Sequence, residues 1–69
     1  MTQKELLYVE DAIGHETSVI AYLNDAINNL EDEELISYIG DVIKKHEETK
    51  KRLIKKLEDK TNEWSRNNE

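Results

Sequence analysis

The chain has 69 residues, 38% of them charged, with a net charge of −6 and neither cysteine nor proline. This composition excludes disulfides and thiolate metal sites and favours long exposed helices over a compact mixed fold. No apolar run approaches the roughly 20 residues that span a bilayer, and the first residues lack the basic-then-apolar order of a signal peptide. We therefore expect one small domain that is soluble and cytoplasmic, has no membrane partner and needs self-association to be stable.

A first helix is predicted over about residues 3–30. Thr2 and Glu5 have the Thr-x-x-Glu spacing of a capping box, with Thr2 as the N-cap. Apolar residues then recur three and four positions apart, which predicts a seam that packs lengthwise on another helix, as in a coiled coil. The seam consists of Leu6, Val9, Ile13, Ile20, Leu23, Ile27 and Leu30. One step of the series falls on Glu16.

A second stripe runs beside this seam on the same helix. It consists of Ala12, Val19 and Ala26, edged by Tyr8, His15 and Tyr22. The non-polar sector therefore covers roughly half of the helix circumference, which is more than one partner helix can cover. We expect His15 and Tyr22 to lie at an interface or at the surface rather than in a binding site.

A turn at about residues 31–32 and a second helix over about residues 33–64 follow. Asp32 is a suitable N-cap, and Glu33 and Glu34 place negative charge at the positive end of the helix dipole. The apolar residues of this helix are Leu35, Ile36, Ile39, Val42, Ile43, Leu53, Ile54, Leu57 and Trp64. His46 lies near the centre of their stripe. Trp64 is expected at the far end of the bundle, and residues 65–69, which have no periodicity, are expected to be a disordered tail.

The predicted fold class is all-α. Residues 1–64 form an antiparallel two-helix hairpin, and two such hairpins pair into a homodimeric four-helix bundle. With a turn centred between residues 31 and 32, position n faces about position 63 − n, so that His46 is predicted to lie near Glu16.

Two interpretations of Glu16 and His46 remain open. In the first, they form a structural polar layer in which Glu16 pairs with His46, or with Lys50 one turn further along, and sets register and oligomeric state. In the second, two-fold pairing brings two Glu16 and two His46 together as ligands of one iron, manganese or zinc ion. We expect no catalytic residues, because no nucleophile with a base and no phosphate-binding loop occurs in the sequence.

The charges are distributed unevenly along the chain. Residues 1–43 hold ten acids against Lys4 alone, whereas residues 44–69 hold nine Lys or Arg against six acids. The basic stretch keeps RNA binding by a hairpin dimer as a lesser alternative. Acids interleave with these bases in the i to i+4 pairs Glu47–Lys51 and Glu48–Arg52, which favours a solvated helix face and argues against nucleic acid as a partner.

The run "AIGHETSVIAYLNDAINNLEDEELISYIGDVIKKHEETKKRL" resembles one half of a ferritin-like domain of the rubrerythrin and spore-coat type. The resemblance rests on these features: Ala12 and Ile13 followed by Glu16, Tyr22, the "DEEL" entry to the second helix, and His46 followed by Glu47 and Leu53. It implies that each half supplies a glutamate from its first helix and a Glu-x-x-His from its second to a di-metal centre, with Glu16 and His46 at the matching positions.

Ile43 stands three residues before His46, where this family pattern has a glutamate. The resemblance therefore implies a ferritin-like scaffold rather than an oxidase. We expect a self-associating structural or partner-binding module. Whether it also holds one metal ion between the Glu16 and His46 residues of two chains is left open by the sequence. The alternative is a metal-binding redox protein of the ferritin or rubrerythrin kind.

Overall fold

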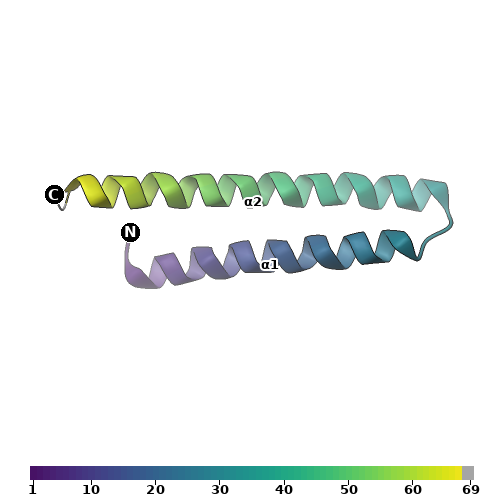
Figure 1. Cartoon of the computed structure of the whole chain (residues 1–69), viewed down its shortest axis with the longest axis horizontal. Coiled ribbons are helices and arrows are strands. Elements are labelled where there is room, and N and C mark those ends of the chain that lie inside the picture. Colours follow the sequence, from purple (N-terminus) through teal and green to yellow (C-terminus); the bar gives the residue numbers. More distant parts are fainter. Residues whose placement is uncertain (68–69) are drawn as a thin grey trace.

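A computed structural model describes the backbone of residues 1–67 and the side chains of residues 1–62. In this range the chain consists of two antiparallel helices that lie side by side, α1 (Gln3–Asn28) and α2 (Glu33–Asn67), joined by residues 29–32 (Figure 1). The molecule measures 55 × 16 × 12 Å, and its radius of gyration of 16.2 Å exceeds the roughly 11 Å of a compact domain of this length. The predicted all-helical hairpin is confirmed for the described residues.

The start of α1 is the predicted capping box. The Thr2 side-chain oxygen accepts a hydrogen bond from the Glu5 amide at 3.1 Å, and a Glu5 carboxylate oxygen accepts one from the Thr2 amide at 2.7 Å. The bond from the Thr2 amide lowers the pKa of Glu5, because it stabilises the charged carboxylate. This contribution to stability is therefore present above the ordinary pKa of a glutamate and is lost as the pH falls through the lowered value.

The end of α1 falls at Asn28, earlier than the predicted residue 30. The Asn29 amide donates to the Ala26 carbonyl oxygen at 3.0 Å, and the Leu30 amide donates to the Ile27 carbonyl oxygen at 3.2 Å. The Asn29 side chain donates to the Asp25 carbonyl oxygen at 2.9 Å. These bonds close the last turn and satisfy carbonyl groups that a continuing helix would have used. The apolar period continues to Leu30, which is half-buried, because a residue that follows a helix can still pack against the neighbouring helix.

The start of α2 at Glu33 agrees with the predicted N-cap. One carboxylate oxygen of Asp32 accepts hydrogen bonds from the amides of Glu34 at 3.0 Å and Leu35 at 3.1 Å. Asp32 thus satisfies two of the amides that the first turn of a helix leaves without a partner in the helix.

The end of α2 differs from the predicted residue 64, because the backbone is helical as far as Asn67. Helical backbone thus extends over residues 65–67, part of the stretch 65–69 for which the sequence predicts a disordered tail. Neither glycine nor proline occurs there to end the helix, and helical backbone hydrogen bonds do not require an apolar period. Residues 68–69 and the predicted position of the Trp64 side chain lie outside the described part of the structure.

The core of the hairpin is the contact between the two predicted seams. Among the described side chains only Ile43 is buried, with 7% of its surface exposed. Most of the other seam residues are half-buried, whereas Leu35 and Ile54 are exposed, since a single pair of helices covers only one side of each helix. Within the described residues, neither helix is long and apolar enough to cross a membrane.

Candidate functional site

The two predicted site residues meet between the helices. Nδ1 of His46 in α2 lies 2.5 Å from Oε2 of Glu16 in α1. The His46 side chain is 33% exposed and the Glu16 side chain is 15% exposed, so the pair is partly shielded from water. The predicted proximity of Glu16 and His46 is therefore found in the structure. Of the two partners predicted for Glu16, the contact shown is with His46 rather than Lys50.

The position of the pair follows from the seam spacing. Glu16 lies three residues after Ile13 and four before Ile20, and His46 lies three residues after Ile43. Both side chains therefore occupy seam positions, where the antiparallel hairpin turns them toward the partner helix. Glu16 is also halfway along α1 (Gln3–Asn28), which places the polar pair near the middle of the paired length.

The contact determines which imidazole nitrogen is engaged. Because the Glu16 carboxylate is an acceptor, the geometry assigns the proton of a neutral His46 to Nδ1, and Nε2 then carries the lone pair. A carboxylate on one ring nitrogen is also the arrangement that orients metal-binding histidines in other proteins. The pair can therefore act as a structural hydrogen bond or present Nε2 to a ligand.

The described side chains of one chain do not by themselves form a cluster of metal ligands. The described side chains contain no group of three or more His, Cys, Asp or Glu that could hold an ion, whereas protein zinc sites have three or four protein ligands. Ile43, which stands where the ferritin-like pattern has a metal-bridging glutamate, is the buried residue of the core. A carboxylate at that position would be desolvated at a cost of several kcal/mol in the absence of a metal. The aliphatic side chain found there packs in the core and is not a metal ligand, which differs from the di-metal pattern.

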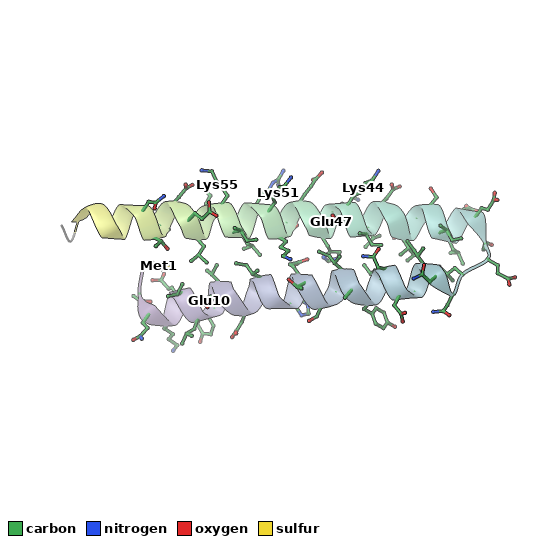
Figure 2. All side chains as sticks on the ribbon, in the orientation of Figure 1. Met1, Glu10, Lys44, Glu47, Lys51 and Lys55 are labelled. Atoms are coloured by element: carbon green, nitrogen blue, oxygen red, sulfur yellow. The ribbon has the colours of Figure 1, made fainter. Side chains whose placement is uncertain are left out.

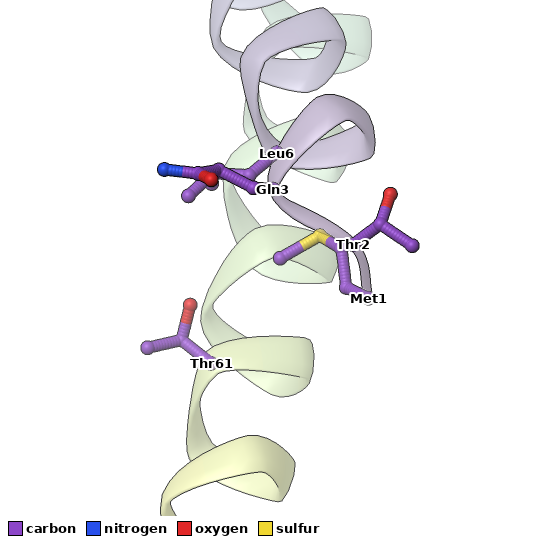
Figure 3. A pocket seen from close by; sticks show the side chains of 5 residues that line it. All are labelled: Met1, Thr2, Gln3, Leu6 and Thr61. Atoms are coloured by element: carbon purple, nitrogen blue, oxygen red, sulfur yellow. The ribbon is translucent and has the colours of Figure 1, made fainter.

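Surface grooves lie at the open end and beside the pair. The groove at the open end has a volume of about 320 Å³ and is lined by Met1, Thr2, Gln3, Leu6 and Thr61 (Figure 3). A second groove of about 350 Å³ is lined by Ile20, Glu47, Glu48, Lys50, Lys51 and Ile54.

The basic residues of α2 lie on its outer side. Figure 2 shows Lys44, Lys51 and Lys55 pointing away from α1. Lys55 forms an ion pair with Asp59 at 3.0 Å, and this hydrogen bond raises the pKa of Lys55. An ion pair between residues four positions apart therefore forms on this face, as predicted, but not between the predicted residues. Among the described side chains neither Glu47–Lys51 nor Glu48–Arg52 forms an ion pair.

The fold and the contact together define an all-helical hairpin with one carboxylate–imidazole pair at mid-length. No family model, curated protein or solved structure matches the chain. The resemblance to ferritin-like domains therefore remains an expectation from the residues quoted above.

Proposed function

We propose that this protein is a self-associating structural module whose hairpins pair into a homodimeric four-helix bundle that offers a scaffold to a protein partner. The observation that carries the proposal is the incomplete core. In the described part of the chain Ile43 alone is buried, whereas Tyr22, Tyr38 and Leu35 expose 75%, 65% and 49% of their surface. Exposed apolar surface of this kind marks an interaction site rather than a finished monomer.

Size supports the same conclusion. A chain of 69 residues without cysteine has neither a large core nor a disulfide to offset the conformational entropy of folding. A two-helix hairpin leaves the outer half of each apolar sector in water, and pairing two hairpins covers it. We therefore propose that folding and self-association of the chain are coupled.

Sedimentation equilibrium at micromolar concentrations tests this proposal. We expect a particle of twice the chain mass of 8.1 kDa, and we expect helicity measured by circular dichroism to fall on dilution, because a dimer's stability depends on protein concentration. A fully helical monomer across the same concentrations would contradict the proposal.

A single metal ion shared by two chains is the second candidate function. It is favoured by the contact between Glu16 and Nδ1 of His46, which leaves Nε2 to bind an ion, and by the position of the pair at mid-length, where two copies can bring their pairs together. Iron, manganese and zinc all accept imidazole and carboxylate ligands. With Ile43 in place of a bridging glutamate, we propose ion binding without oxidase activity.

Elemental analysis and thermal melts with added Fe(II), Mn(II) and Zn(II) test this candidate. Protein purified without chelator or affinity tag should hold about one ion per dimer, and metal at 100 times its dissociation constant should stabilise the fold by about 2.7 kcal/mol. His46→Ala should abolish both effects, whereas His15→Ala, a matched change of an exposed histidine, should preserve them. Identical melts with and without metal would leave the pair as a structural layer.

A further inference from the structure

We infer that the second copy docks on one particular broad face of the hairpin. Six residues form this surface, which we name the tyrosine face: Val19, Tyr22 and Ala26 of α1, and Leu35, Tyr38 and Val42 of α2. The inference rests on the proposed self-association and specifies the surface through which it occurs.

The spacing of these residues places them on the same side of the molecule. Val19 and Ala26 each precede a seam isoleucine of α1, and Leu35 and Val42 each precede a seam isoleucine of α2. Two antiparallel helices are related by a two-fold axis perpendicular to the plane of the hairpin. Rotation about that axis exchanges the two helices but leaves each broad face where it is. Residues that precede a seam position in α1 therefore lie on the same broad face as residues that precede a seam position in α2. Tyr22 and Tyr38 lie one turn away from these residues on each helix, at the edge of that face.

The tyrosine face is uncharged and largely open to solvent. Tyr22, Tyr38 and Leu35 expose 75%, 65% and 49% of their surface, and the other three residues are half-buried. None of the six side chains is an acid or a base with a charge at neutral pH, although 38% of the residues in the chain are charged. Exposed aromatic and aliphatic side chains grouped on one surface are characteristic of the centre of a protein interface.

The opposite broad face has a different character. It is formed by residues that directly follow seam positions, among them Glu10, Thr17, Asn24 and Glu47, all of which are exposed. The side chains of Thr17 and Asn24 are turned back on their own helix, where they donate to the carbonyl oxygens of Ile13 and Ile20 at 3.0 Å. Figure 2 looks along the shortest axis of the hairpin, at right angles to its two broad faces.

A second copy fits this face for three reasons. Because a two-fold pair uses the same patch on both partners, an apolar patch without charge is its own complement. The broad face as a whole measures 55 by 16 Å, which is comparable in area to the roughly 800 Å² that each partner contributes to a standard interface. The tyrosine face is its uncharged part nearest the turn, and charged residues that also precede seam positions, such as Lys45 and Lys56, lie on the rest of it. Finally, two-fold pairing with both turns at the same end places the two tyrosine faces opposite each other and brings the two mid-length Glu16–His46 pairs to the same level, so that polar layers meet and apolar layers meet.

Replacing Tyr38 by aspartate tests the assignment. Tyr38→Asp should weaken dimerisation by about 30-fold or more, the loss expected of an aromatic anchor at an interface, because it replaces a large aromatic side chain of the tyrosine face by a charge. The matched control is Leu7→Asp, which changes another exposed apolar residue (57% exposed) that follows seam residue Leu6 and so lies off this face. Its dimer constant should change by no more than about twofold. Circular dichroism at high concentration should show equal helicity for the two variants.

Nitration of tyrosine in the wild-type chain provides a readout without mutation. Tyr22 and Tyr38 should react slowly at concentrations where the dimer predominates and rapidly after dilution. A wild-type dimer that tolerates Tyr38→Asp, or in which both tyrosines react at the monomer's rate, would overturn the assigned face while leaving self-association intact. A wild type that is monomeric at every concentration would overturn the proposed function itself, and this inference with it.

Discussion

Ile43→Ala is expected to lower the free energy of unfolding by about 2 to 3 kcal/mol, within the range measured for truncating buried isoleucine. Ile43 is the most buried described side chain, with 7% of its surface exposed. Alanine would leave a cavity between the helices in addition to the lost transfer free energy. The loss should be in the lower half of the measured range, because the half-buried neighbours can move toward the gap.

Urea denaturation at one fixed protein concentration would measure this effect, since the concentration of a self-associating chain enters its apparent stability. Ile54→Ala is the matched control. It removes the same atoms from a side chain that is already 36% exposed, so we expect it to cost less than about 1 kcal/mol. Equal losses for the two variants would show that the buried contact at Ile43 does not dominate the stability of the hairpin.

The joint replacement of Glu16 and His46 by leucine is expected to raise stability by about 1 kcal/mol, as found for other shielded ion pairs that were exchanged for apolar groups. The single change Glu16→Leu should instead lower it by about 1 to 2 kcal/mol, because it leaves the imidazole without its partner in a partly shielded position. For a domain of this size each kcal/mol corresponds to about 4 to 8 °C in Tm. Thermal melts of the two single variants and the double variant would form the cycle.

The oligomeric state of the double variant would show what the polar pair contributes. If the pair sets the register between copies, the leucine variant should be more stable but should form additional oligomers, because a buried polar layer is a known determinant of register. A double variant that is less stable than the wild type would show that the pair is a source of stability in its own right.

Much of the local structure can be read from neighbouring residues. The capping box at Thr2 and the N-cap at Asp32 depend on hydrogen bonds between residues two or three positions apart, so the sequence predicts them directly. The end of α1 was less predictable, because the bonds of Asn29 ended the helix before the apolar period ended at Leu30. Periodicity reports which residues pack, and a residue can pack without being helical.

The outer side of α2 shows a further limit of sequence reasoning. Several lysines have an acid four positions away, and spacing alone does not rank these pairs. The structure selects Lys55 and Asp59. On an exposed helix face such pairs differ by only a few tenths of a kcal/mol, so small differences in side-chain conformation decide which of them forms.

Local sequence is sufficient to predict two helices, their N-caps, the seam between them and the contact of Glu16 with His46, because helical period and turn position together set the register of an antiparallel hairpin. The packing of the two helices sets how deeply each seam residue is buried, which nitrogen of His46 contacts Glu16, and that Tyr22, Tyr38 and Leu35 remain exposed. A helical period gives the direction of a side chain around its helix. Burial depends on the atoms that surround that side chain, and one partner helix surrounds only half of an apolar sector this wide.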